Sequence, residues 1–264
     1  MKPYLSKSRL ISAWQCARRL HLEKHHPELG EVSEQTEPLF ATGHQVGAIA
    51  QQLYGTDESV EVEFNFKTME AETRRLIEGG ANFPIFEATF RHENVMVRVD
   101  VMIPDGPEND NSWRIVEVKA STSVKETHAL DCAIQDWVLR NNGIKVTSIA
   151  LAHINNQFVY EGDGNYDGLL VENDLTDEVH LLEPTVLELV AKAREAVTGP
   201  LPNVPVGAHC NNPYECQFIH YCWPTDAEYP VSGLGGSKAK LAEYVVRGCE
   251  DIRDVAAEDI SAET

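Results

Sequence analysis

Two carboxylates and a lysine stand on neighbouring segments that have the apolar alternation of β-strands. Asp100 lies within residues 95–103, and Glu117 and Lys119 lie within residues 113–119. Side chains alternate along a strand, so Glu117 and Lys119 point to the same face. Two carboxylates can hold Mg²⁺ or Mn²⁺, because these cations prefer oxygen ligands, and a lysine beside them can orient or deprotonate a water. A bound cation lowers the pKa of water and stabilises charge on a phosphate, which is the chemistry of phosphodiester hydrolysis.

The elements that must position these side chains follow a mixed order. Hydrophobic periodicity and turn signals predict the series helix, strand, strand, strand, helix, strand over residues 68–78, 84–90, 95–103, 113–119, 125–141 and 146–154. Further helices are predicted over residues 7–25, 37–54 and 183–197. This order implies an α/β domain with helices on a sheet. It favours catalysis over the alternative of a solvent-exposed charged cluster, which the Glu-x-Lys spacing alone does not exclude.

The segments VRVDVMI and WRIVEVKASTSVKETHALDCAIQ, at residues 97–103 and 113–135, resemble the PD-(D/E)XK nuclease superfamily, specifically its RecB-like branch. The resemblance implies a restriction-endonuclease-like core, a mixed sheet flanked by helices. It maps the first motif aspartate to Asp100 and the (D/E)-x-K motif to the Glu117-Val118-Lys119 tripeptide. It also implies a deoxyribonuclease that depends on Mg²⁺ or Mn²⁺.

The same resemblance extends to residues outside the tripeptide. RecB-like nucleases carry a histidine on a helix before the strands and a glutamine on the helix after the lysine, and His44 and Gln135 fit these places. The resemblance thus makes His44 a metal ligand, although a surface histidine is the alternative. Gln135 would contact the substrate backbone, but the tyrosine that many relatives carry four residues later is Leu139 here. The Val118 carbonyl is a candidate further ligand.

Glu87 lies on the strand that precedes the one with Asp100. From there its carboxylate could reach the same cleft and hold a second metal or tune Lys119. An edge-strand glutamate without a catalytic role is the alternative.

Four of the six cysteines form a separate candidate site. Cys210, Cys216 and Cys222 are evenly spaced in HCNNPYECQFIHYCW, and Cys16 lies far from them in the sequence. In a cytosolic protein, clustered cysteines favour metal binding over disulfides. The arrangement is similar to that of iron–sulfur RecB-like nucleases, among them the AddB nuclease domain, CRISPR-associated spacer-acquisition nucleases and an uncharacterised bacterial RecB-like family. The resemblance implies that these four cysteines hold a [4Fe–4S] cluster.

A cluster of this kind would join the N- and C-terminal segments. Zinc is the alternative, because His209 and His220 flank the cysteines and Cys₃His and Cys₄ sites are common. The expected division is an N-terminal helical segment with the first cysteine, a nuclease core, and a cysteine-rich segment with an acidic tail, at residues 1–36, 37–199 and 200–264.

The composition limits the classes of function. The net charge of −20 argues against a protein that coats nucleic acid. No apolar run approaches the roughly 18 residues that span a membrane, and the N-terminus lacks the pattern of a signal peptide, so a cytoplasmic protein is expected.

Together these observations predict a DNA nuclease, expected to be an exonuclease on single-stranded or end-containing DNA in repair, recombination or defence. The resemblance also makes a helicase or another repair or defence protein a plausible partner. The alternative is a non-catalytic DNA-binding or scaffold module that carries an iron–sulfur or zinc site. The intact set of Asp100, Glu117 and Lys119 argues against this alternative, since a binding module does not need it.

Overall fold

The structure, a computed structural model, describes residues 2–31, 36–107, 110–223 and 226–260. The chain divides into two compact units, each containing two stretches of sequence. The first unit comprises Met1–Ser8 and Gln35–Val190, and the second comprises Arg9–Glu34 and Ala191–Thr264. The expected division into three parts, at residues 36 and 199, stays a prediction.

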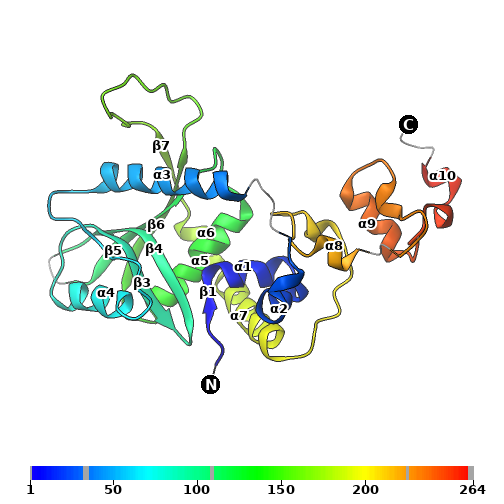
Figure 1. Ribbon diagram of the computed structural model, residues 1–264. Coiled ribbons are helices and arrows are strands. Elements are labelled where there is room, and N and C mark those ends of the chain that lie inside the picture. The colour runs from blue at the N-terminus through cyan, green and yellow to red at the C-terminus, as the bar shows by residue number, and fades with distance from the viewer. Residues whose placement is uncertain (1, 32–35, 108–109, 224–225, 261–264) are drawn as a thin grey trace. The chain divides into compact units, whose positions relative to one another are not determined.

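The first unit is built on a mixed sheet that has seven strands within the described residues (Figure 1). The strands are β1 Leu5–Ser6, β2 Val60–Glu61, β3 Ile85–His92, β4 Val95–Pro104, β5 Ser112–Lys119, β6 Lys145–Ile154 and β7 Leu170–Asp174. Their order in the sheet is β2, β3, β4, β5, β6, β7, and β1 pairs with one end of β4. Neighbouring strands are antiparallel except for the parallel pairs β1–β4, β2–β3 and β5–β6.

Helices cover this sheet and connect its strands. They are α3 Thr36–Tyr54, α4 Met69–Glu78, α5 Glu126–Arg140 and α6 Thr176–Leu181. Two further helices, α1 Lys7–Gln15 and α7 Glu183–Thr198, have residues in both units. The series α4, β3, β4, β5, α5, β6 is the one that the sequence predicts, and it confirms the mixed α/β core.

Alternation along the strands gives the sheet two different faces. Val101 and Val116 belong to an apolar cluster with Phe86, Ala150 and Ala152, and Tyr54 at the end of α3 packs against this cluster. Glu117 follows Val116 and therefore points to the opposite face. That face is next to α5, since the Gln135 side chain of α5 contacts Glu117. Helix α5 is buried along almost its whole length, so it fixes the side chains around the carboxylates firmly.

A hydroxyl joins α4 to the sheet. Met69, Thr73 and Leu76 recur at helical spacing and form the buried side of α4. The Thr73 hydroxyl donates to the Met69 carbonyl at 3.0 Å and accepts the Thr89 N–H of β3 at 2.8 Å. The buried donor of β3 is thereby satisfied by the helix that covers it.

The second unit is helical within its described residues. Its elements are α2 Ala17–His25, α8 Ile219–Cys222, α9 Lys238–Val246 and α10 Ala257–Ile260, with 3-10 helices at Pro27–Leu29, Ala208–Cys210, Val231–Gly233 and Ile252–Asp254. One small core contains Leu22, Cys216 and Phe218, and another forms around Val206, Trp223 and Tyr244.

The single helix predicted over residues 7–25 is wrong. Two helices, α1 and α2, take its place, because the helix is interrupted at Cys16, whose φ of −161° and ψ of 118° are those of extended backbone. The side chain of the preceding Gln15 donates through Nε2 to the carbonyls of His209 and Tyr214, at 2.6 and 2.7 Å. These long-range bonds hold the chain at the break. None of the helices in the described part of the chain is long and apolar enough to cross a membrane.

Candidate active site

Three acidic residues lie in a row across β3, β4 and β5. The β4–β5 ladder ends at the pair Val101 and Val116, so the next positions, Asp100 and Glu117, face each other. The β3–β4 ladder pairs Phe86 with Val101 and Ala88 with Val99, which places Glu87 across from Asp100. The Asp100 side chain also accepts the Val118 N–H at 2.7 Å, so it holds β5 directly. The row of Glu87, Asp100 and Glu117 is the acidic row.

Glu117 is the centre of a network of charged hydrogen bonds. It is 1% exposed, and its Oε1 accepts from Lys119 Nζ at 2.6 Å and from Lys7 Nζ at 2.7 Å. Its Oε2 accepts from Gln135 Nε2 at 2.6 Å. Lys119 Nζ reaches Asp131 Oδ2 at 2.6 Å, and Lys7 Nζ lies 3.4 Å from the same oxygen. Two ammonium groups therefore lie between two carboxylates.

This network fixes the charge states of its members. Burial would raise the pKa of Glu117, but Lys119 and Lys7 outweigh it and hold that pKa well below its usual range. Burial would lower the pKa values of Lys7 and Lys119, but the carboxylates of Asp131 and Glu117 raise both well above their ordinary value. Lys119 is therefore a positively charged hydrogen-bond donor in this state.

The pKa of Asp100 shifts in the direction opposite to that of Glu117. Burial, and next the negative charge of Glu117, raise the pKa of Asp100 to about 7, although Lys7 and Lys119 oppose the shift. Burial also raises the pKa of Glu87, while its partner Arg98 lowers it. Crowded carboxylates of this kind favour a divalent cation, because it would relieve their mutual repulsion.

The donor set fits Mg²⁺ or Mn²⁺. Mg²⁺ commonly takes one or two carboxylates and completes its shell with waters, and Asp100 and Glu117 supply two. Gln135 adds a buried Oε1 that has no hydrogen-bond partner, at an amide whose nitrogen binds Glu117. An unsatisfied buried acceptor indicates a place for a water or a ligand. A cation on Glu117 would have to compete with Lys7 for Oε1.

The structure does not assemble the predicted set of three metal ligands. His44 is exposed on α3, whose Tyr54 packs on the sheet face opposite to Glu117. Among the described residues, no group of three or more His, Cys, Asp or Glu is placed to hold one metal ion. His44, Asp100 and Glu117 therefore do not form such a group within the described part of the chain. The roles of His44 and of the Val118 carbonyl as ligands stay predictions.

Glu87 has an unusual backbone for a strand residue. Its φ is 58°, in the left-handed region, and its carboxylate pairs with Arg98 at 3.2 Å. Residues other than glycine adopt this conformation in a strand only at a cost of about 1–3 kcal/mol, and such strain gathers at functional sites. The conformation is thus consistent with a site at the acidic row.

Sequence reasoning missed Lys7 and Asp131. Asp131 precedes Gln135 by four residues, one helical turn, so the helix predicted over residues 125–141 already put both on one face. Lys7 had no such signal, because it lies 110 residues from Glu117 and belongs to no motif with it.

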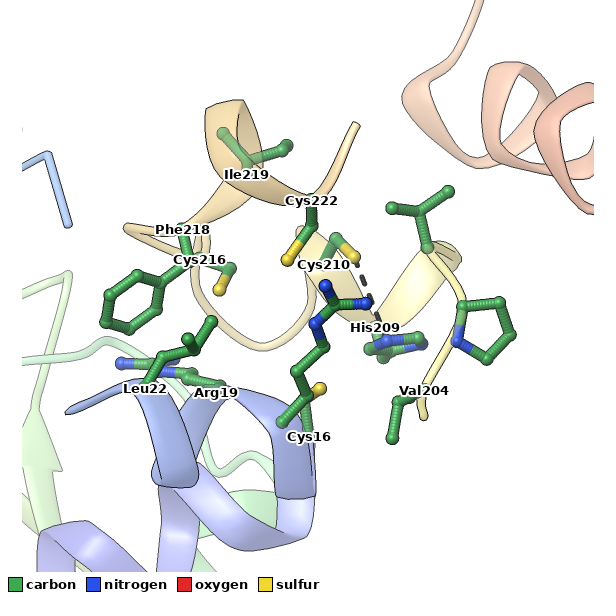
Figure 2. Close-up of a pocket in the computed structure, with 13 residues that line it drawn as sticks. Cys16, Arg19, Leu22, Val204, His209, Cys210, Cys216, Phe218, Ile219 and Cys222 are labelled. Carbon is green, nitrogen blue, oxygen red and sulfur yellow. Dashed lines mark hydrogen bonds between the residues drawn. The ribbon is translucent and has the colours of Figure 1, made fainter. Parts of the chain in front are cut away.

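The four predicted cysteines come together in the second unit. Cys16, Cys210, Cys216 and Cys222 line one pocket, and Figure 2 shows them on separate turns of the chain around a common space. None of them forms a disulfide. Burial raises the pKa values of Cys210, Cys216 and Cys222, and the neighbouring Cys16 adds to each shift. The four thiols are thus close enough to influence one another.

Arginines share this pocket with the thiols. Arg18 and Arg19 line it, and they lower the pKa values of Cys222 and Cys216 against the larger effect of burial. His209 also lines it, with Nε2 at 3.8 Å from the sulfur of Cys210. Four cysteines are the usual ligand set of iron–sulfur clusters. The adjacent arginines would balance the net negative charge of a cluster bound by four thiolates.

Comparison with known proteins yields distant similarities. No protein-family model and no curated protein matches the sequence. Among solved structures, the crystal structure of SSO0001 has a TM-score of 0.42 at 15% identity, covering 77% of this chain and 81% of its own. An alkaline exonuclease from Laribacter hongkongensis, LHK-Exo, has a TM-score of 0.29 at 13% identity, covering 72% and 89%. Its complex with dAMP has a TM-score of 0.27 at 15% identity, with the same coverage. Similarities at this level carry no argument about the present chain.

Proposed function

We propose that the protein is a metal-dependent deoxyribonuclease that hydrolyses phosphodiester bonds in single-stranded or end-containing DNA. The observation that carries the proposal is the acidic row, with the Lys119 ammonium hydrogen-bonded to Glu117 beside it. Carboxylates and a lysine that meet on adjacent strands are costly to bury. A purely structural sheet has no need of such charged side chains. The sequence resemblance to RecB-like nucleases supports the same function.

In this proposal Asp100 and Glu117 would hold Mg²⁺ or Mn²⁺. When bound, the cation would supply Lewis acidity to the phosphate and lower the pKa of a bound water. Lys119, held charged by Glu117 and Asp131, would donate a hydrogen bond that positions the attacking water or a phosphate oxygen. The unpartnered Oε1 of Gln135 would accept a hydrogen bond from that water. The water oxygen forms a bond to phosphorus as the bond to the 3′ oxygen breaks; one proton of the water passes through solvent to that oxygen, so the products are a 5′-phosphate and a 3′-hydroxyl.

Cleavage of end-labelled DNA tests this function. Wild-type protein with Mn²⁺ should degrade single-stranded or duplex DNA, and Lys119→Ala should lower the rate by about 10²–10³-fold, as for loss of one preorganised donor. Lys125→Ala removes an exposed lysine near the start of α5 and serves as the matched control. Lys119→Met, an uncharged side chain of nearly the same length as lysine, is the second variant in case the alanine variant does not fold.

Two outcomes would contradict the proposal. Cleavage by Lys119→Ala at the wild-type rate would place the chemistry elsewhere. A folded wild-type protein that binds DNA without cleaving it would favour the binding-module alternative. DNA is the partner that the proposal requires, and a helicase partner rests on the sequence resemblance alone.

We also propose that Cys16, Cys210, Cys216 and Cys222 hold a [4Fe–4S] cluster with a structural role. Support comes from the shared pocket and its arginines. Cys₄ is the usual ligand set of an iron–sulfur cluster, whereas a zinc site could use the same four cysteines or three of them with a histidine.

Metal analysis of protein purified without oxygen tests the cluster. We expect about four iron and four sulfide per chain, with visible absorption that Cys216→Ser reduces and Cys132→Ser does not. Cys132 is the matched control because it is a buried thiol outside the pocket. Stoichiometric zinc in a colourless preparation would instead assign the zinc alternative.

A further inference from the structure

An exposed pair of aromatic rings lies beside the acidic row in the first unit. Phe64 and Phe66 follow β2 and are 70% and 53% exposed. Large exposed aromatic side chains are unusual on a surface that has so many charged residues. They stand two residues apart in the segment that leads from β2 to α4.

Each ring is seated on an arginine of the sheet. The Arg98 guanidinium of β4 lies 5.1 Å from the centre of the Phe64 ring. The Arg91 guanidinium of β3 lies 5.6 Å from the centre of Phe66 and 5.7 Å from that of Tyr4. Tyr4 meets Phe66 edge to face, with ring centres 5.5 Å apart. Contacts of this kind fix the rings from below while a large part of their surface stays open to solvent.

The strands order these ring–arginine pairs into a line. On the face that carries Asp100, β4 presents Arg98 two positions away, which is about 7 Å along a strand. The register pairs Arg98 with Thr89 and Met96 with Arg91. Moving away from Asp100 and Glu87, the line therefore passes Phe64 on Arg98 first and Phe66 on Arg91 next. We call Phe64, Phe66, Arg98, Arg91 and Tyr4 the aromatic track.

The track is also connected to the acidic row by a direct bond. Arg98 Nη2 contacts Glu87 Oε2 at 3.2 Å and donates to the Val62 carbonyl at 3.2 Å, so one guanidinium joins the Phe64 segment to the acidic row. Lys67, exposed after Phe66, adds a cation at the far end.

We propose that the aromatic track binds single-stranded DNA by stacking bases on Phe64 and Phe66, and so leads a strand to the acidic row. Bases stack on aromatic side chains in a sequence-tolerant way, and grooves that combine such rings with arginine are typical of single-strand binding. Duplex DNA keeps its bases paired and stacked, so it cannot use the rings. The inference rests on the proposed nuclease function for its choice of ligand, and it names the form of DNA that the site takes.

Fluorescence anisotropy with labelled DNA in EDTA tests the track without requiring cleavage. The probes are an oligothymidylate of about 20 nucleotides and a duplex of the same length. Phe64→Ala with Phe66→Ala should weaken binding of the single strand by roughly tenfold for each ring and leave duplex binding unchanged. Tyr229→Ala is the matched control, because Tyr229 is 52% exposed and sits 5.0 Å from the Arg253 guanidinium in the second unit.

Substitutions at the same positions separate stacking from general apolarity. Phe64→Tyr with Phe66→Trp should keep wild-type affinity, whereas Phe64→Leu with Phe66→Leu, which is less disruptive to folding than alanine, should lose it. Equal affinity of wild type and the double leucine variant for the single strand would overturn the track, as would absence of single-strand binding by wild type.

Cleavage assays run beside these titrations keep the two proposals apart. Wild type that cleaves DNA, with ring variants of unchanged affinity and KM, would reject the track and leave the nuclease function standing. Ring-dependent binding of the single strand by a wild-type protein that never cleaves would support the track and reject the nuclease.

Discussion

At the scale of single residues, Lys7 changes the view of the candidate site most. The Glu117 carboxylate that would hold a cation already shares Oε1 between two ammonium groups, those of Lys7 and Lys119. Lys119 has the further anchor of Asp131 at 2.6 Å, whereas Lys7 lies 3.4 Å from that oxygen. Lys7 is therefore the ammonium that an incoming cation would displace more easily.

Lys7→Met should have two opposite effects. Without metal, the variant should be less stable by about 2 kcal/mol, below the 3–5 kcal/mol that loss of a fully buried partner costs, because the Lys7 side chain is 21% exposed. With Mn²⁺, the variant should gain more stability than wild type, because the cation no longer competes with an ammonium. Thermal unfolding in EDTA and in Mn²⁺ measures both effects.

The exposed Lys125 offers a control for this comparison, since Lys125→Met should change neither value. A Lys7→Met protein that no longer responds to Mn²⁺ would show that Lys7 helps to bind the cation instead of competing with it.

At the scale of elements, the central strands could be predicted from the sequence because apolar residues alternate with polar ones or follow one another along each strand. The strands expected over residues 95–103 and 146–154 correspond to β4 and β6, and turn signals between them leave little freedom in the order of elements. The pairing of Asp100 with Glu117 then follows from the adjacency of β4 and β5. Local pattern was sufficient here, because β4 and the second half of β6 have no exposed residue.

The features that the sequence did not predict depend on tertiary structure. The break at Cys16 is held by bonds from Gln15 to backbone carbonyls almost 200 residues later, which no local periodicity contains. The sequence placed His44 on a helix, but the face of the sheet that the helix covers is a tertiary property. The left-handed φ of Glu87 was equally hidden, because nothing in the residues around it marks a strained position.

At the scale of the whole molecule, acidity dominates. Asp and Glu number 42 against 22 Lys and Arg, so the excess carboxylates repel one another. They also repel the phosphates of DNA beyond short range. An approach to DNA through ring stacking is compatible with this charge, because stacking does not require many phosphate contacts. The cations at the candidate site, Lys7 and Lys119, are paired within the protein and do not form a general basic surface.

The same acidity predicts that salt stabilises the protein. Raising NaCl from about 0.02 M to about 0.5 M shortens the Debye length from roughly 20 Å to roughly 4 Å, which screens repulsion between exposed carboxylates. The bonds of the largely buried Glu117 and Asp131 to lysine are screened much less. We expect the free energy of unfolding to rise by about 1–2 kcal/mol, seen as a Tm higher by about 2–8 °C in thermal unfolding.

Two controls test whether screening is the cause. KCl at equal ionic strength should give the same shift in Tm, and Glu188→Lys, at an exposed position of α7, should reduce that shift. A Tm that falls with salt would mean that exposed ion pairs outweigh the repulsion.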